Sequence, residues 1–325
     1  MLGFVVRRLI VSIIVLFVAS VLIYFTVTSF GDPLGELRSR NPPVPEHVIE
    51  ARRVAIGLDK PAHERYLTWA SGVVRMDFGD TLQGQPVNEL LWRRLQRTMR
   101  MVIASVVLSL VLAVGVGVLS ATRQYSKTDY FFTFSGFLFL SMPVFWLAAL
   151  LKEFAAIRVN QLVGRRIIYT TGSESPRLTG DFWDRMANYA GHLVLPTIAL
   201  ALISYAAWSR YQRSSMLDVM ESDYVKLARA KGASRKRVVF RHGLRNALIP
   251  LTTVVAIDFG AVFGGAIITE QVFGWSAMGN LLIQGLRDYD VNVVLAWMMV
   301  TGVLVIVFNL IADLLYGVLD PRIRQ

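Results

Sequence analysis

The residues best suited to chemistry lie in one charged segment, Asp223–Pro250, which stands between two long apolar stretches. Nine basic and three acidic side chains fall between Tyr211 and Leu248. The basic ones are Arg213, Lys226, Arg229, Lys231, Arg235, Lys236, Arg237, Arg241 and Arg245, and the acidic ones are Asp218, Glu221 and Asp223. Basic groups at this density can bind a partner protein or anionic lipid at a membrane surface. The residues alone leave both alternatives open.

The second candidate is Asp258, near the middle of the apolar stretch Asn246–Thr269. A carboxylate at the centre of a membrane costs at least about 2.5 kcal/mol, so it should face water or a partner group. Asp258 either lines a hydrated path or is a hydrogen-bonded or protonated packing residue. Gly260 and Gly264 form a GxxxG pair, which permits close helix contact within the chain or with a partner.

Motifs for catalysis are missing from the sequence. It contains no Gly-Lys dipeptide and therefore no GxxxxGK[ST] phosphate-binding loop. It contains neither a GxSxG motif nor a cysteine. The histidines are widely spaced, at His47, His63, His192 and His242, and suggest no metal site. We predict no catalytic residue, no metal site and no enzyme activity in this chain.

The composition indicates a membrane protein. Of the 325 residues, 54% are hydrophobic and only 18% are charged. Apolar runs without Asp, Glu, Lys or Arg cover Leu9–Gly31, Met101–Thr122, Tyr130–Leu151, Met186–Ser209 and Val291–Ala312, and a sixth, Asn246–Thr269, is interrupted only by Asp258. Each can supply the roughly 20 residues that a transmembrane helix needs. Because the runs do not alternate, we predict an all-α membrane protein with about six transmembrane helices and no barrel.

Positive charge predicts the orientation, since cytoplasmic loops are richer in Lys and Arg. If Asp223–Pro250 lies inside, both termini do too, because the short basic flanks fall on the same side. These flanks carry Arg7 and Arg8, Arg123 and Lys127, and Arg322 and Arg324. A cluster on the predicted outer side contradicts the rule, namely Arg93, Arg94, Arg97 and Arg100. The inward-facing basic loop explains the net charge of +11 without nucleic acid.

The first apolar run should remain as a helix and not be cleaved as a signal peptide. Arg7 and Arg8 before an apolar run would suit a signal peptide. However, the run exceeds the usual hydrophobic length, and Gly31-Asp32-Pro33 is a poor cleavage site.

Within the basic segment, the spacing of apolar residues predicts one helix over Met216–Lys231. Its periodic residues are Met216, Leu217, Met220, Tyr224, Leu227 and Ala228. Gly232 can take the positive φ that ends a helix, and Ser234 can cap the next one. Two helices should therefore meet at a bend, where Ala228, Ala230 and Gly232 are small enough for a partner to approach closely.

Two outer loops are expected. In the first, Asn41–Pro45 is rich in proline and should be extended. A helix should follow over Glu46–Ile56 and end at Gly57. The second, Ile157–Arg185, contains turn-forming residues at Thr170–Ser173.

Several motifs resemble one known family. They include Leu58–Pro61 with Tyr66 and Trp69, Asp77–Gly79, Arg213–Leu217, Ala228–Gly232, Arg241–Pro250, Gly264–Ala266, Glu270, Phe273 and Leu319–Arg324. Over nearly its whole length the chain is similar to the B-type transmembrane subunit of oligopeptide/dipeptide ABC importer permeases. It departs from the family at Met76, Asp80-Thr81 and Gly274–Gly279, where a Pro-Gly-Leu-Gly run is common.

The resemblance implies a type I ABC importer permease fold with cytoplasmic coupling (EAA) helices and a large outer loop. Residues 1–100 would hold the first transmembrane helix and the extracytoplasmic loop, and 101–325 the transmembrane core with the EAA loop at 213–250. The protein would be a multi-pass protein of the bacterial cell membrane that takes up oligopeptides or dipeptides. It would need no cofactor of its own.

The implied partners are a second homologous permease, two ATPase subunits or domains that bind ATP, an extracytoplasmic peptide-binding protein, the peptide and membrane lipid. The residues that would couple to the ATPase are Asp223, Ala228, Arg229, Ala230, Lys231, Gly232, Arg241 and Asn246. Those assigned to the translocation pathway are Asp258, Gly260 and Gly264, with Asp258 facing the amino group of the peptide.

Two other classes fit less well. A secondary transporter needs coupling-ion residues in broken helices, and the midplane offers no acid apart from Asp258. An intramembrane protease needs a nucleophile motif, and none is visible.

Overall fold

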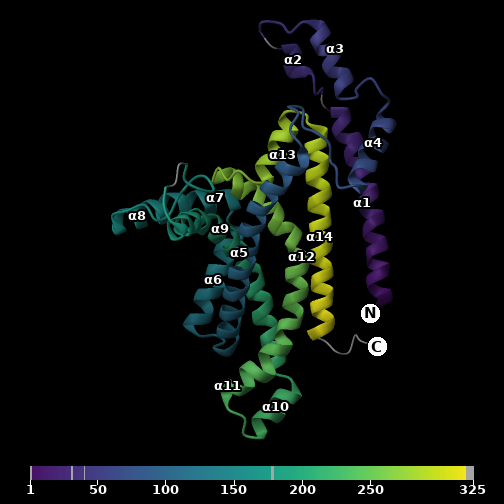
Figure 1. The fold of residues 1–325 in the computed structure, drawn as a ribbon. Helices are drawn as coiled ribbons and strands as arrows, with labels where there is room; N and C mark the ends of the chain where they lie inside the picture. Colours follow the sequence, from purple (N-terminus) through teal and green to yellow (C-terminus); the bar gives the residue numbers. More distant parts are fainter. Residues whose placement is uncertain (1, 31, 40, 177–178, 320–325) are drawn as a thin grey trace. The chain divides into compact units, whose positions relative to one another are not determined.

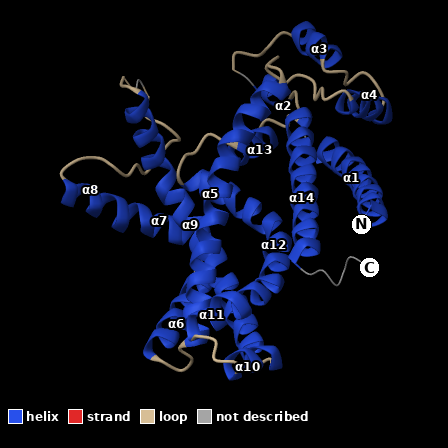
Figure 2. Cartoon of the chain, turned by 60° about the horizontal axis from the view of Figure 1, so that its bottom comes forward, coloured by secondary structure: helices blue, strands red, loops and turns tan. Residues whose placement is uncertain are grey.

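The computed structural model describes residues 2–30, 32–39, 41–176 and 179–319. These residues form helices and loops, with no strand among them (Figure 2). The predicted all-α class is therefore confirmed. Gly31 and the terminal motif residues Asp320–Arg324 lie outside the described residues.

The helices are labelled in Figure 1. In chain order they are α1 (Leu2–Phe30), α2 (Gly35–Ser39), α3 (Glu46–Ala55), α4 (Ala62–Val74), α5 (Val87–Thr122), α6 (Lys127–Ser141), α7 (Val144–Leu150), the π-helix η1 (Leu151–Ile157), α8 (Arg158–Val163), α9 (Phe182–Met220), α10 (Asp223–Ala230), α11 (Arg235–Arg237), the π-helix η2 (Val238–Leu244), α12 (Arg245–Val272), α13 (Met278–Arg287) and α14 (Val291–Leu319).

Five helical segments among the described residues are long and apolar enough to cross a membrane. They are Val6–Ser29, Val87–Thr122, Phe182–Met220, Arg235–Val272 and Val291–Ile311. A sixth crossing is a pair of helices, Lys127–Ser141 and Val144–Val163, bent by 111°. About six spans were predicted, and the count holds if the bent pair is one of them.

The bend has a local cause in the sequence. Pro143 precedes α7, and its ring disfavours helical backbone at the preceding residue. Met142 accordingly has extended angles, with φ −87° and ψ 127°. The predicted run Tyr130–Leu151 is therefore interrupted and is not one straight helix.

The second predicted span is much longer than its apolar run. Its helix, α5, begins at Val87 instead of Met101 and has 36 residues, about 54 Å at 1.5 Å per residue. That length exceeds the hydrocarbon thickness of about 30 Å. The four arginines before Met101 thus belong to the same helix, where Arg97 donates to the Ser276 carbonyl (3.1 Å) and the Arg100 guanidinium lies 5.5 Å from the Tyr189 ring centroid. Arg97 and Arg100 of this cluster thus have partners within the described part of the chain.

The chain divides into two compact units, of which the first comprises residues 1–97 and 276–306. Here α4 packs beside α1, where the hydroxyls of Ser20 and Tyr66 are 2.9 Å apart. Tyr24, Tyr66 and Leu295 form its buried apolar cluster. The predicted end of α3 at Gly57 is confirmed, since Gly57 has a φ of +70° and the Leu58 amide donates to the Arg53 carbonyl.

The second unit comprises residues 98–275 and 307–325. Two long helices, α9 and α12, pack along each other and make up much of its core. Leu195 and Ala199 of α9 pack with Phe273, and Ser109 of α5 donates to the Ala201 carbonyl at 3.0 Å.

A buried ion pair joins α6 to α9 in this unit. Arg213 donates from Nε and Nη2 to the two oxygens of Asp129, each at 2.8 Å. The Asp129 side chain is only 4% exposed and that of Arg213 is 28% exposed. The carboxylate also accepts from the Tyr125 amide (3.0 Å), while Ser126 caps α6 by accepting from the Asp129 amide. One carboxylate therefore holds the α5–α6 turn and α9 together.

Removing one partner of this pair should destabilise the protein. We expect Asp129→Asn or Arg213→Gln to lower the free energy of unfolding by about 3 kcal/mol, because a buried charge loses its partner. The double variant should lose at least about 1 kcal/mol less than the sum of the single losses. Denaturant unfolding of the detergent-purified chain measures all three values.

The control is Arg53→Gln, at an exposed ion pair with Glu50 (3.5 Å). It should change the free energy of unfolding by no more than about 0.5 kcal/mol. Additive losses in the double variant would show that the Asp129–Arg213 contact contributes nothing.

Candidate functional site

The basic segment begins with a break that the sequence did not predict. The structure ends α9 at Met220 and starts α10 at Asp223, so the single helix predicted over Met216–Lys231 is wrong. Ser222 takes extended angles as the N-cap of α10, and its carbonyl accepts from the Val225 and Lys226 amides. Ser and Asp favour such caps over helix interiors, which explains the break at this point.

The break changes which face of α10 is buried. Val225 is fully buried, whereas Tyr224 and Leu227 are 43% and 55% exposed. The prediction placed Tyr224 and Leu227 on one stripe with Met216 and Met220, because it assumed one unbroken helical period. After the restart at Asp223 they lie on the outer face instead.

The end of α10 confirms the prediction for Gly232. This residue has a φ of +79°, its amide donates to the Arg229 carbonyl (2.9 Å), and the Ala233 amide donates to the Ala228 carbonyl (3.1 Å). The two bonds form a Schellman motif, which satisfies the last carbonyls of the helix. Ser234 then accepts from the Arg237 amide at 3.4 Å and caps α11, also as predicted.

The returning part of the segment packs against α5 and α9. Val239 and Ala247 share a buried cluster with Val118 and Met216. Ser215 donates to the Ala247 carbonyl at 3.0 Å. A Cβ on Gly243 would stand 2.8 Å from the Met216 Cε, so a larger residue would displace that side chain. The segment is thus held firmly at its base, while α10 and the turn after it project (Figure 1).

Most of the residues predicted to contact a partner are exposed. This holds for Asp223, Arg229, Ala230, Lys231, Gly232, Arg241 and Asn246, whereas Ala228 is half-buried. The Asn246 amide donates to the Tyr224 hydroxyl (2.8 Å), which ties α12 to α10. Tyr224, Leu227 and Phe240 add exposed apolar area that sequence reasoning missed. The resulting surface is basic and partly apolar.

Beside this surface lies a groove of about 540 Å³. Its walls come from the ends of α5 and α9 and from α10 and α11; they include Met220, Glu221, Arg229, Arg235 and Val238. The Arg235 Nη2 donates to the Thr122 carbonyl (2.8 Å), at the C-terminal end of α5. Arg229 is the predicted residue that lines the groove. Glu221 and Arg235 also line the groove, and the linear sequence does not show that they meet there.

Asp258 has a hydrogen-bond partner within the chain. The indole Nε1 of Trp208, a fully buried residue of α9, donates to Asp258 Oδ2 at 2.8 Å. Asp258 itself is half-buried on α12. The contact agrees with the hydrogen-bonded interpretation, and the incomplete burial leaves room for a second contact. No signal in the sequence pointed to Trp208.

The two glycines of the GxxxG pair differ in exposure. Gly260 is half-buried, and Gly264 is exposed. Apart from the local backbone of α12 and the adjoining residues, no described atom lies within 4 Å of where a Cβ on Gly264 would stand. A Cβ on the neighbouring Gly265 would meet Leu200 at 3.4 Å. Gly264 therefore lies on an open face of α12, together with Ile257 and Ile268, which are 72% and 45% exposed.

Two family profiles match the chain. Residues 113–325 match the binding-protein-dependent transport system inner membrane component, and residues 1–86 match the N-terminal region of the same kind of protein.

Among curated proteins, the oligopeptide transport system permease protein OppB of Mycobacterium tuberculosis is 41% identical over 318 residues, covering 98% of both chains. AppB of Bacillus subtilis, also an oligopeptide transport system permease protein, is 36% identical over all of both chains. The dipeptide transport system permease protein DppB of Escherichia coli is 34% identical over 100% of this chain and 99% of its own.

Solved structures agree on the fold. A chain of the inward-facing MetNI methionine ABC transporter aligns with a TM-score of 0.56 at 18% identity, covering 71% of this chain and 96% of the other. With the helical spans and the match over residues 113–325, these similarities show that the chain belongs to the family of binding-protein-dependent transport system inner membrane components.

Proposed function

We propose that this protein is the permease subunit of an ATP-driven importer that takes up oligopeptides or dipeptides delivered by a binding protein. The full-length similarity to OppB, AppB and DppB carries the proposal, because it covers the outer loop as well as the helical core. The direct test is uptake of labelled peptide by the reconstituted complex. Uptake should require ATP, the binding protein and this chain together, and uptake driven by an ion gradient alone would favour a secondary transporter.

The partners follow from what this chain contains. It lacks the phosphate-binding motif, so two separate ATPase subunits or domains would bind and hydrolyse ATP. The open α12 face around Gly264 suits close contact with a second homologous permease. Peptides would pass between the two permeases, and this chain would hold no cofactor.

We further propose that α10 and the turn at Gly232 form the contact with the ATPase. The surface offers exposed cations for acidic partner groups and an apolar area at Tyr224 and Leu227. Its base is packed on Met216 and bonded to Ser215, so that movement of α10 would displace α9 and α12 with it. This packing supports a coupling role for the segment.

The first prediction from this proposal concerns Gly232. Gly232→Pro should reduce ATP-dependent uptake at least about tenfold, since Pro cannot take a φ of +79° and loses the donor to Arg229, and such strain costs about 1–3 kcal/mol. Membrane insertion should be normal. Uptake and ATP hydrolysis in proteoliposomes, with the amount of inserted chain measured by blotting, give the result.

Gly232→Asn is the matched control, because Asn tolerates the left-handed region and a Cβ there meets nothing within 4 Å. It should retain most of the uptake. Equal uptake by the Pro variant and the wild type would remove this turn from the coupling mechanism.

The second prediction concerns topology, with both termini and α10 proposed to lie in the cytoplasm of a bacterial cell. Because the chain has no native thiol, single cysteines report accessibility cleanly. Gln83→Cys and Thr171→Cys, both exposed, should react with an impermeant maleimide in intact cells. Lys236→Cys should react only after the membrane is permeabilised. Thr81 and Ser173, which lie two residues from Gln83 and Thr171, are buried and therefore unsuited to labelling. Labelling of Lys236→Cys in intact cells would show that the orientation is the reverse of the one proposed.

The third prediction concerns Asp258, which we propose faces the pathway with its second oxygen. Asp258→Asn keeps an acceptor for the Trp208 indole but loses the charge. Uptake of basic peptides should then fall several-fold more than uptake of acidic ones, because one favourable charge interaction is lost. Competition between matched basic and acidic peptides measures the ratio.

Trp208→Phe serves as the comparison, since it removes the indole donor and leaves the carboxylate in place. It should weaken stability without changing the ratio of basic to acidic uptake. An unchanged ratio in Asp258→Asn would restrict Asp258 to a packing role.

A further inference from the structure

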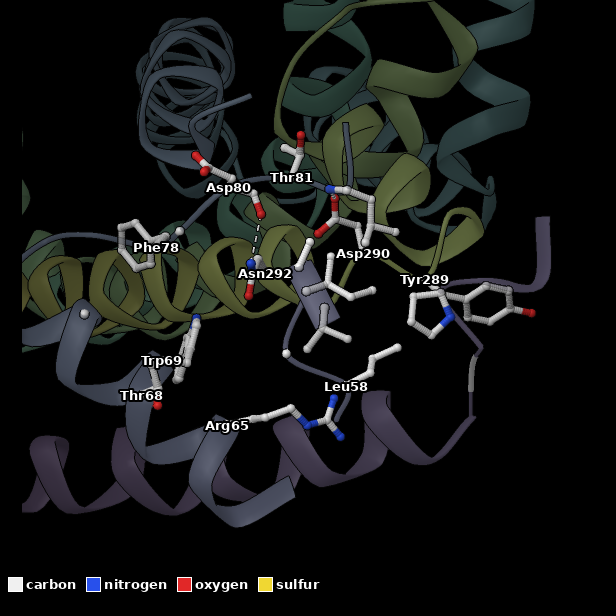
Figure 3. A pocket seen from close by; sticks show the side chains of 18 of the residues that line it. Leu58, Arg65, Thr68, Trp69, Phe78, Asp80, Thr81, Tyr289, Asp290 and Asn292 are labelled. Atoms are coloured by element: carbon white, nitrogen blue, oxygen red, sulfur yellow. Dashed lines mark hydrogen bonds between the residues drawn. The ribbon is translucent and has the colours of Figure 1, made fainter. Parts of the chain in front are cut away.

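The first unit contains a cavity of about 500 Å³, a volume common for small-molecule sites. Figure 3 shows Trp69 of α4 pointing toward Asn292 and Arg65 of the same helix extending along the cavity. The cavity is distinct from the basic segment and from Asp258, both of which belong to the second unit.

The wall formed by α4 presents unused hydrogen-bond donors. Arg65 and Trp69 are four residues apart and therefore lie on the same face of the helix. Arg65 Nε and Trp69 Nε1 are both shielded from solvent, and neither has a hydrogen-bond partner. A buried N–H without an acceptor is unfavourable, so the two donors favour a ligand that brings acceptor oxygens. Arg52 and Lys60 also line the cavity and add positive charge.

On the opposite wall, the side chains of Asp290 and Asn292 already have hydrogen-bond partners within the chain. Asp290 accepts from the Leu82 amide at 2.7 Å and from the Val293 amide at 3.3 Å. The Asn292 amide donates to the Asp80 carbonyl at 2.8 Å, which appears as the dashed line in Figure 3. Burial raises the pKa of the Asp290 carboxyl, although these amide donors lower it in part. This wall therefore needs no ligand, whereas the α4 wall does.

Two residues that line the cavity stand near the ends of candidate membrane spans, where the membrane interface is expected. They are Tyr24, close to the end of the first candidate span, and Val291, the first residue of the last span. Tyr and Trp side chains gather at such interfaces, and here Tyr24, Tyr66 and Trp69 pack together. Exposed apolar side chains continue from the same elements, namely Leu67, Val74, Leu22 and Phe25.

From this arrangement we propose that the cavity binds the phosphate of a phospholipid headgroup, with Arg65 and Trp69 donating to its oxygens and the acyl chains lying along α1 and α4. Phosphate offers several strong acceptors, and guanidinium groups bind it well. Three acids also line the cavity, Asp77, Asp80 and Asp290, against the three cations Arg52, Lys60 and Arg65. This balance favours a zwitterionic headgroup such as phosphoethanolamine over a purely anionic one.

The test counts lipids on the assembled transporter by native mass spectrometry. The complex is delipidated in detergent and titrated with dioctanoyl phosphatidylethanolamine. Dioctanoylglycerol is the control compound that lacks the phosphate, and inorganic phosphate is the control that lacks the acyl chains. We expect one phosphatidylethanolamine per copy of this chain and no comparable retention of either control compound.

Trp69→Phe and Arg65→Met should each weaken lipid retention roughly tenfold, because each removes a buried donor to a charged group. Their controls are Trp92→Phe, at an indole that is 62% exposed, and Arg53→Met, at an exposed arginine. Both controls should retain lipid like the wild type. If a variant complex does not assemble, the thermal midpoint of the wild-type complex still tests the site. It should rise with phosphatidylethanolamine and not with dioctanoylglycerol.

Four results would overturn the proposal. Wild-type retention in both donor variants would show that the donors do not hold the lipid. Equal retention of dioctanoylglycerol would show that only apolar contacts hold the lipid. Equal binding of inorganic phosphate would show that the phosphate need not come from a lipid. Unchanged lipid retention with weaker capture of the purified binding protein would assign the cavity to that protein.

Discussion

Every buried backbone N–H and C=O must find a partner, and this need governs the structure, because an unpaired buried group costs about 1–3 kcal/mol. Continuous helices meet that need, and the interruptions come with local compensation. At Gly232 and again at Gly274, positive φ lets two amides return to the last carbonyls of a helix. At Ser222 the freed carbonyl accepts from two amides of α10. Bends therefore occur where the chain can repair its own hydrogen bonding.

Acidic side chains in the long helices follow the same rule. Asp129 accepts hydrogen bonds from Nε and Nη2 of Arg213, and Asp258 accepts one from the Trp208 indole. Buried Glu270 accepts one from the Thr98 hydroxyl. Each contact joins two different helices. Charges that would be costly alone thus act as specific ties between elements, a use for which buried polar pairs are suited when fully hydrogen-bonded.

Glycines serve two separate purposes in the second unit. At Gly232 the positive φ favours glycine and space does not, since a Cβ would meet nothing within 4 Å. At Gly243 and Gly117 the requirement is space, since a Cβ would stand within 2.8 Å of Met216 and 2.7 Å of Gln212. The first kind ends α10, whereas Gly243 lets the base of the segment approach α9 and Gly117 lets α5 approach α9. A rigid base with a projecting helix is the arrangement that a coupling element needs.

The sequence alone determined the properties that depend on neighbouring residues. Apolar runs predicted the helical class and about six spans, and Gly57, Gly232 and Ser234 marked helix ends correctly, because turn and cap chemistry acts within a few residues. Only the tertiary structure decided the extension of α5 to Val87 and the partner of Asp258. The restart at Asp223 follows local cap chemistry at Ser222, which the prediction from periodicity overlooked. The extension and the partner depend on packing between residues far apart in the chain, such as Trp208 with Asp258. Helical periodicity carries no record of such pairs.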